Sequence, residues 1–305
     1  MLSETDLNDV IEQQKKIARV AHYTTMEGFH GLLQHSEGTG KQLQLNFWAS
    51  SIFAMNDPDE LMYGYDVIWK WLPEIEEKLE APQEHRLSNI WKPYSSNNPF
   101  DYNEALKRSF YKHKEVPYLI SFSRSIDSLP MFRWYSNDGQ GISIGFSRAE
   151  LEGNGMFLSD VMYNIEKIKG AYSSYDMVFT VYRAYIGAIT SNNDDTHTFD
   201  IMLKYLTMLY LVVAPYIKRG DYENEREIRS IKLNKLNDDV LFRLSKNGNI
   251  IPYIIQKIPI NAVKKIIVGP CTDFLTAQRM IELELLSKGV DWIPVEKSET
   301  TYRRY

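Results

Sequence analysis

The spacing of apolar residues along the chain predicts an alternation of strands and helices. Apolar residues at every second position, or in short unbroken runs, are typical of half-buried and buried strands. Segments of this kind lie at residues 43–49, 118–122, 141–146, 156–163, 225–233, 240–244, 251–258, 264–270 and 291–295, with a shorter strand end at residues 21–23. Apolar residues three and four positions apart predict helices at residues 9–20, 26–33, 175–189, 199–216 and 274–287, and one long helix after residues 56–60.

Strands at both ends of the chain with helices between them predict a single α+β domain over residues 1–305. We expect two insertions, near residues 60–117 and residues 165–217. The second insertion carries two long apolar helices and therefore adds a helical layer. Its apolar run at residues 201–217 is interrupted and falls short of a bilayer span, so we expect a buried helix and no membrane segment.

Composition narrows the class of protein. The net charge of -5 and the isoelectric point near 5.8 provide no overall basic field to attract a polyanion. The single cysteine, Cys271, excludes a disulfide framework within the chain and fits a reducing compartment. The first twenty residues contain early acidic residues and no unbroken apolar stretch, which argues against a secretory signal. We therefore expect a cytoplasmic protein.

Common catalytic motifs do not occur in the sequence. It contains no GxSxG elbow, no GxxxxGK[ST] phosphate loop and no GxGxxG fingerprint after a strand. None of the six histidines lies at a spacing typical of zinc ligands, so we expect no resident metal. The usual hydrolase, nucleotide triphosphatase and Rossmann classes therefore lack support.

Residues 121–146 place two predicted strands around a turn rich in aromatic, basic and glycine residues. Met131 and Trp134 fall at helical spacing, so we expect them to be core residues of a short helix that begins at Pro130. The other side chains offer hydroxyl, guanidinium and aromatic contacts that suit a ligand with a phosphate group and a ring. These side chains are Ser123, Arg124, Arg133 and Tyr135.

A histidine and a tyrosine stand at the end of the first short strand, before a helix whose cap we expect at Thr25. In this position the imidazole of His22 can donate to a ligand hydroxyl, and the phenol of Tyr23 can cover a flat ring. A lone histidine also serves as a structural residue in many proteins. The sequence therefore leaves both interpretations open for this pair.

A late acidic segment contains Glu225, Glu227 and Arg229, which point to one face if the segment is a strand. Such a face is either a solvated surface or a site. In a site, one carboxylate would orient a sugar hydroxyl and stabilise positive charge that develops on the adjacent carbon.

Taken together, these segments resemble the bacterial family known as domain of unknown function 2971. The resemblance spans residues 20–270 and is carried by the order of the landmarks rather than by any single motif. The landmarks are His22-Tyr23-Thr24, Asn56-Asp57-Pro58, Phe122-Ser123 through Met131, Trp134 and Tyr135 to Gly141, Glu225-Arg226-Glu227-Ile228-Arg229, and the IIVGP of residues 266–270.

That family is distantly similar to the ADP-ribosyltransferase fold, in which mixed and antiparallel sheets form a cleft that binds NAD as substrate. By this resemblance, His22 would bind a ribose of NAD, Glu227 would bond the 2′-hydroxyl of the nicotinamide ribose, and Glu225 would lie where the acceptor is placed. The remaining NAD-binding residues implied by the resemblance are Tyr23, Thr24, Ser123, Arg124 and Tyr135. Ser123, Tyr135 and Ser143 are all candidates for the site residue of the middle strand.

The resemblance thus implies an NAD-dependent ADP-ribosyltransferase that acts as a bacterial toxin or antiviral defence effector. Its acceptor would be a cellular macromolecule, either protein or single-stranded nucleic acid, and a neutralising antitoxin would be a further partner. Two alternatives stand beside it. One is a metal-dependent nuclease in which Asp221, Glu225 and Glu227 hold a divalent cation, and the other is a non-catalytic module that binds or senses a nucleotide.

Overall fold

The computed structural model describes residues 19–55, 60–90, 115–163, 174–191, 197–235, 239–245 and 248–303. Within these residues the chain forms a mixed α+β structure around a ten-stranded, mostly antiparallel sheet, which confirms the predicted α+β class. The strands are β1 (Arg19–Thr24), β2 (Gln44–Ser51), β3 (Glu115–Ser123), β4 (Ile142–Ser147), β5 (Leu158–Asp160), β6 (Glu227–Lys235), β7 (Leu241–Leu244), β8 (Ile250–Pro259), β9 (Val263–Val268) and β10 (Val295–Lys297). The α-helices are α2 (Met26–Gln34), α3 (Glu60–Lys78), α4 (Leu87–Ile90), α6 (Leu129–Tyr135), α7 (Arg148–Gly153), α8 (Ser174–Thr190), α9 (Thr198–Met208) and α10 (Phe274–Ser287).

The sheet branches at β3. Along one edge β3 pairs with β6 over all nine of its residues. The opposite edge is divided, because β2 pairs at Tyr118 and Leu119 whereas β1 pairs at Ser123. Beyond the branch the order is β1-β4-β9-β10 on one side and β2-β8-β7 on the other. β1 and β2 therefore diverge along β3, and no described strand pairs with the middle of that edge, near Ser121.

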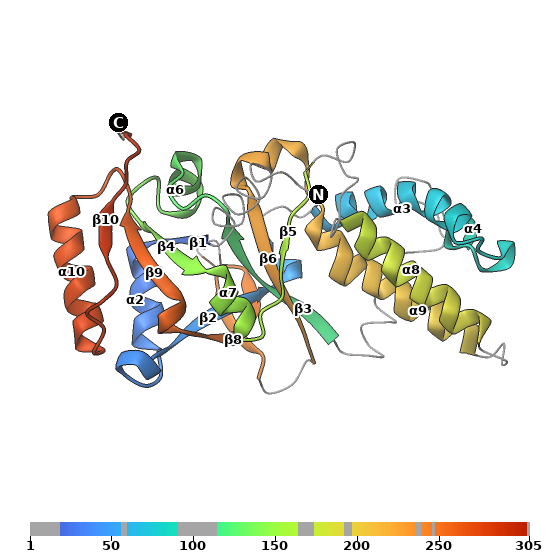
Figure 1. Cartoon of the computed structure of the whole chain (residues 1–305), viewed down its shortest axis with the longest axis horizontal. Coiled ribbons are helices and arrows are strands. Elements are labelled where there is room, and N and C mark those ends of the chain that lie inside the picture. The colour runs from blue at the N-terminus through green and yellow to red at the C-terminus, as the bar shows by residue number, and fades with distance from the viewer. Residues whose placement is uncertain are drawn as a thin grey trace, which may run out of the picture.

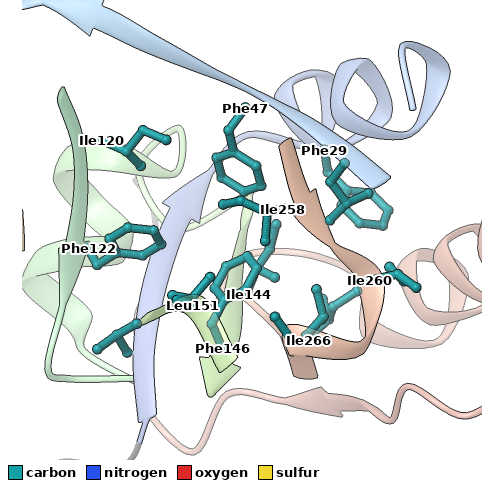
Figure 2. Close-up of a cluster of buried hydrophobic side chains, with 14 of the residues drawn as sticks. Phe29, Phe47, Ile120, Phe122, Ile144, Phe146, Leu151, Ile258, Ile260 and Ile266 are labelled. Atoms are coloured by element: carbon teal, nitrogen blue, oxygen red, sulfur yellow. The ribbon is translucent and has the colours of Figure 1, made fainter. Parts of the chain in front are cut away.

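The main hydrophobic core joins the strands to helices α2 and α10, which lie at the same end of the molecule (Figure 1). Figure 2 shows part of this core, in which Phe47, Phe122 and Phe146 come from three different strands. The ring of Phe146 lies 5.7 Å from that of Phe47 and 5.8 Å from that of Phe122, in edge-to-face geometry. Since aromatic pairs in this geometry add to the free energy of burial, the three rings fix β2, β3 and β4 relative to one another.

Helices α3, α8 and α9 form a helical layer at the other end of the molecule (Figure 1). A second hydrophobic cluster fills this layer. Its interior also holds the carboxylate of Glu76, which accepts hydrogen bonds from the backbone of Ser88 and the hydroxyl of Tyr182, each at 3.0 Å. Because a buried carboxylate needs such partners, these contacts tie α3 to α8 and to the segment that contains α4.

The helix expected at residues 199–216 changes its geometry along its length. α9 is followed by a π-helical turn at Leu209–Val213 and a 3₁₀ turn at Ala214–Tyr216, where Pro215 removes a backbone donor. By length and composition the whole stretch, Thr198–Tyr216, could cross a membrane. Half of its most apolar window is buried within the protein, where it packs on α3 and α8.

The segment between β3 and β4 folds into α6 and a glycine turn, as its sequence predicts. Gly139 has a φ of +86°, and a Cβ atom on Gly141 would lie 2.3 Å from the backbone oxygen of Thr24, so the turn needs glycine at both positions. The expectation of two core residues in α6 is half right. Met131 is buried, whereas Trp134 lies on the outer side of the short helix and is 53% exposed.

Several boundaries differ from the expected ones. Of the strand expected at residues 156–163 only β5 forms, and the last strand begins at Val295 rather than at residue 291. β6 begins at Glu227, because the preceding residues form a 3₁₀ turn, Gly220–Glu225. Of the helix expected at residues 9–20, residues 9–18 lie outside the described residues, and Arg19 and Val20 belong to β1 instead. The Asn-Asp-Pro landmark at residues 56–58 also lies outside the described residues.

Two aromatic residues of α6, Phe132 and Trp134, provide a test of this packing. Phe132 is fully buried against the first strand, so Phe132→Ala should lower the free energy of unfolding by about 3–5 kcal/mol. Trp134→Ala, a matched change in the same helix, should alter it by no more than about 0.5 kcal/mol. Urea unfolding followed by circular dichroism measures both. Equal losses in the two variants would contradict the position of α6.

Candidate functional site

A cavity of about 330 Å³ opens at the branch of the sheet. It is lined by residues from segments that are far apart in the sequence, from Ala21 on β1 to Ile251 on β8. The polar and aromatic residues of its lining are His22, Tyr23, Ser50, Ser51, Ser121, Ser123, Tyr135, Lys218, Tyr222, Glu225, Glu227, Arg229 and Arg243. Six of the eight site residues predicted from sequence are in this set, so the fold brings most of them together.

His22 lies on β1 beside the unpaired middle of β3. Its Nδ1 lies 3.0 Å from the backbone oxygen of Ser121. Burial lowers the pKa of His22 below 6.5, although the hydrogen bond to Ser121 acts in the opposite direction, and the imidazole is therefore neutral at pH 7. A carbonyl oxygen only accepts, so Nδ1 carries the proton and Nε2 is left as an acceptor. The expected role as a donor to a ligand hydroxyl is thus replaced by a role as an acceptor.

Aromatic rings hold the imidazole in place. The rings of Phe47 and Phe122 meet that of His22 at centroid distances of 5.2 and 6.1 Å, both near perpendicular. Both phenylalanines belong to the main hydrophobic core. The orientation of His22 therefore depends directly on the packing of the sheet.

The centre of the cavity wall is a buried cluster of four charged residues. Glu225, Glu227, Lys218 and Arg229 are 3%, 6%, 5% and 0% exposed. Lys218 Nζ lies 2.5 Å from Glu225 Oε2 and 3.2 Å from Glu227 Oε2, so one ammonium bridges the two carboxylates. Arg229 donates from Nε to Glu227 Oε1 at 2.7 Å and from its second terminal nitrogen to Glu227 Oε2 at 2.8 Å. The acidic segment is therefore a buried cluster of ion pairs and not a solvated surface.

A left-handed residue brings the two carboxylates to the same ammonium. Arg226 stands between them with a φ of +46°, a conformation that is uncommon for residues other than glycine. Its carbonyl accepts from the backbone N–H of Arg124 at 2.9 Å. The resulting kink joins the end of the 3₁₀ turn to the start of β6, so that Glu225 and Glu227 face Lys218 although only Glu227 belongs to the strand.

A short stretch after β5 positions Lys218 and Glu227 together. Met162 accepts from the backbone N–H of Lys218 at 2.8 Å, and the backbone N–H of Val161 donates to the carbonyl of Glu227 at 2.9 Å. The hydroxyl of Tyr163 accepts from the backbone N–H of Glu227 at 2.8 Å. These three neighbouring residues therefore set the separation between the ammonium and the carboxylate.

Glu227 is ionised in this setting. Burial opposes its ionisation, but the positive charges of Arg229 and Lys218 outweigh burial and lower the pKa of Glu227 from 4.5 to about 2. The carboxylate therefore carries its full negative charge at neutral pH. Its charge is balanced within the protein by Arg229 and Lys218.

Tyr135 closes one side of the cavity. Its hydroxyl donates to Glu225 Oε1 at 2.6 Å, and burial together with the charge of Glu225 raises the pKa of Tyr135, so the phenol stays protonated. Its side chain is only half-buried, since the residue is 36% exposed. A flat ring could therefore lie against it while its hydroxyl stays bound to the carboxylate.

Of the three candidates for the middle-strand residue, two line the cavity. Tyr135 does so from α6, and Ser123 does so from β3, where its hydroxyl donates to the backbone oxygen of Glu225 at 2.7 Å. Ser143 lines neither this cavity nor its neighbour, and its hydroxyl donates to the carbonyl of Ile126 at 2.6 Å.

Two further predicted residues lie outside this cavity. Arg124 is in an exposed ion pair with Asp160, at 2.5 Å between Nε and Oδ1, and does not line the cavity. Thr24 faces a second cavity of about 660 Å³ between α2 and β2. Thr24 lies on the same face of β1 as His22, which lines both cavities.

Sequence reasoning missed Lys218, Tyr222 and Arg243, which also line the first cavity. Lys218 and Tyr222 lie in an irregular stretch with no periodic pattern, where the ammonium sits 4.7 Å from the centre of the Tyr222 ring. Arg243 is the one charged residue of a short edge strand, and nothing in the sequence distinguishes it from a surface charge. A signal for Lys218 was present in principle, since two nearby carboxylates that fold into a core require a cation.

The donor set does not favour a divalent metal. Among the described residues, no group of three or more histidine, cysteine or acidic side chains converges in a way that could hold an ion. Asp221 does not line the cavity, and Lys218 and Arg229 already neutralise Glu225 and Glu227. The nuclease alternative therefore has no support in the described part of the chain.

Comparison with known families gives one match. Residues 131–230 match the model of the family described as "Protein of unknown function (DUF2971)", which supports the assignment made from the sequence landmarks. The matched region, about a third of the chain, includes most of α6, Lys218 and the whole acidic segment but not His22. No curated protein and no solved structure matches the chain.

The lowered pKa of Glu227 predicts how stability depends on pH. A carboxyl with a pKa near 2 when folded and 4.5 when unfolded stabilises the protein fully above pH 4.5, and this contribution of a few kcal/mol disappears as the pH falls toward 2. The difference in free energy of unfolding between wild type and Glu227→Gln should therefore be largest at neutral pH and shrink below pH 4.5. Urea titrations from pH 7 to pH 3 measure it.

The matched control is Glu152→Gln, which removes an exposed carboxylate paired with Arg148 on α7. This variant should differ from wild type by no more than about 0.5 kcal/mol at pH 7. An equally small change in the free energy of unfolding for Glu227→Gln at pH 7 would contradict the buried ion-pair cluster.

Proposed function

We propose that this protein is an NAD-dependent ADP-ribosyltransferase, with the cavity at the branch of the sheet as its active site. The observation that carries the proposal is the convergence of His22, Tyr135, Glu225 and Glu227 on one cavity. These residues come from β1, α6, the 3₁₀ turn and β6. The resemblance seen in the sequence names the same four residues.

The lining of the cavity suits the nicotinamide riboside half of NAD. The neutral imidazole of His22 can accept a hydrogen bond from a ribose hydroxyl through Nε2. The half-buried ring of Tyr135 offers a face to the nicotinamide ring. Glu227 is ionised, and its Oε1 accepts from Arg229 while retaining a lone pair for the ribose 2′-hydroxyl.

In the proposed reaction the bond between C1′ of the ribose and N1 of nicotinamide breaks. Both bonding electrons leave with the ring nitrogen, so nicotinamide departs as a neutral molecule and positive charge develops on C1′ and the ribose ring oxygen. The fixed negative charge of Glu227 lies beside this centre and stabilises it. An acceptor nucleophile then bonds to C1′ and gives up its proton, for which Glu225 is the nearest candidate base.

The acceptor is a macromolecule of the host or of an invading phage in this proposal, either a protein or a single-stranded nucleic acid. A toxin or defence effector of this kind acts in the cytoplasm, and its producer would need an antitoxin. Growth of a culture that expresses the protein, compared with one that expresses an inactive variant, tests that part of the proposal directly.

The proposal first predicts an effect on cleavage of NAD. Glu227→Gln keeps the size of the side chain and removes its charge, so release of nicotinamide from NAD should fall by about 10²–10³-fold. Glu152→Gln, the same change at an exposed position, should leave the rate within about two-fold of wild type. Chromatographic assay of nicotinamide measures both. Glu227→Gln also leaves buried cations without a full counter-charge. Glu227→Asp keeps the charge and shortens the side chain, so it should be assayed beside Glu227→Gln.

Full activity in folded Glu227→Gln and folded Glu227→Asp would exclude Glu227 as the group that stabilises the developing positive charge. Absence of nicotinamide release by wild type in the presence of cell extract would overturn the transferase proposal itself. Binding of NAD without turnover in that experiment would point to the nucleotide-sensing alternative.

The second prediction separates the two carboxylates. Glu225 binds the hydroxyl of Tyr135 and the ammonium of Lys218, and it is proposed to face the acceptor. Glu225→Gln should therefore lower labelling of the acceptor at least ten-fold more than it lowers hydrolysis of NAD by water. Labelled NAD with cell extract measures transfer, and the same reaction without extract measures hydrolysis. Equal losses in both assays would assign Glu225 to cleavage rather than to transfer.

A further inference from the structure

The second cavity adjoins the first and shares part of its wall. Five residues line both cavities: His22, Ser50, Leu119, Ser121 and Arg243. The first cavity alone is at the lower end of the range of about 300–1,000 Å³ found for ligand sites. A ligand as long as a dinucleotide would therefore extend from the first cavity, past Arg243, into the second.

Arg243 differs from the two cations in the charged cluster. Lys218 and Arg229 are held by Glu225 and Glu227. Arg243 has no ion pair with any described carboxylate, and one of its terminal nitrogens donates to Ser50 Oγ at 3.2 Å. Its Nε is buried and has no hydrogen-bond partner. A buried guanidinium donor without a partner carries a free-energy cost that an anionic ligand would remove.

An aromatic surface lies next to this guanidinium. The central carbon of Arg243 is 5.8 Å from the centre of the Trp48 ring, and Tyr253 stands 5.0 Å from the same ring on the neighbouring strand. Trp48 is 43% exposed and lines the second cavity. Ser50, Trp48 and Tyr253 lie on the same face of the sheet, because β2 pairs Ser50 with Tyr253 and successive even-numbered residues share a face.

From these contacts we infer that Arg243, Ser50 and Trp48 form a subsite for a nucleoside diphosphate. Arg243 and the Ser50 hydroxyl bind the phosphate groups, and the exposed part of Trp48 stacks against the base in the second cavity. This inference rests on the proposed function in one respect, namely that the diphosphate belongs to the ADP half of NAD. The phosphate-binding role of Arg243 can be tested without any turnover.

The experiment is isothermal titration of the purified protein with ADP. Arg243→Ala should weaken ADP binding by about ten- to a hundred-fold, because it removes charge-assisted hydrogen bonds to phosphate. Its effect on adenosine, which lacks phosphate, should stay within about three-fold. Trp48→Ala should weaken both ligands. Arg279→Ala, an arginine exposed on α10 that lines neither cavity, is the matched control and should bind ADP as wild type does.

Three results would overturn the inference. The first is wild-type affinity of Arg243→Ala for ADP, and the second is no binding of ADP by wild type at millimolar concentration. The third is binding of a ten-nucleotide single strand through Arg243 and Trp48 that ADP cannot displace, since the subsite would then serve a nucleic acid.

Binding of ADP involves no turnover, so this experiment keeps the failure of the inference separate from that of the proposed function. If wild type binds ADP through Arg243 but never cleaves NAD, the subsite stands and the transferase proposal fails.

Discussion

The ammonium of Lys218, shared between Glu225 and Glu227, is the interaction on which the candidate site depends. Removing several charges from water carries a large free-energy cost that only close pairing offsets. Here the pairing is close, at 2.5 and 3.2 Å to the ammonium, and Arg229 adds two contacts to Glu227. The arrangement requires three segments of the chain to meet: the end of the helical layer, the turn before β6, and β6 itself. The site and the junction between the sheet and the helical layer are therefore held by the same contacts.

The branch of the sheet at β3 provides the space. Because β1 and β2 diverge along one edge of β3, backbone groups near Ser121 face side chains instead of another strand. His22 satisfies one of them and is fixed in a single tautomer as a result. In a sheet with continuous pairing that carbonyl would bond to a backbone N–H, and neither the cavity nor the defined orientation of the imidazole would exist.

The sequence predicts the fold at the level of its elements because their periodicity is local. α10, α2 with its cap at Thr25, and the strands on either side of α6 agree with the spacing of their apolar residues. The spacing of apolar residues does not predict the irregular stretches. Lys218 lies after a π-helical and a 3₁₀ turn, and Glu225 is brought beside Glu227 by the left-handed backbone of Arg226.

The same limit applies to the individual residues of the site. The order of the landmarks along the chain selects His22, Tyr135, Glu225 and Glu227, and the fold brings these four residues to one cavity. That order could not exclude Arg124, because the ion pair that holds this guanidinium at the surface involves Asp160, and no local pattern links the two. It could not find Arg243 either, whose significance comes from two cavities that meet at its side chain.

The charges around the two cavities also favour one orientation of NAD in the proposed complex. Among the described residues, three cationic side chains and two carboxylates line the first cavity, an excess of one positive charge. The carboxylates are at the wall formed by β6, whereas Arg243, the cation without an ion pair, is at the passage to the second cavity. A dinucleotide with a positively charged nicotinamide ring at one end and a negatively charged diphosphate in its middle matches this distribution in one orientation. In that orientation the bond between C1′ and the nicotinamide nitrogen lies beside Glu227. The positive charge is on the nicotinamide ring before this bond breaks and moves to C1′ as nicotinamide leaves, so Glu227 stays close to it throughout. The reversed orientation would leave the diphosphate in the middle but would place the uncharged adenine beside the two carboxylates, so the attraction between the carboxylates and the positively charged nicotinamide ring would be lost.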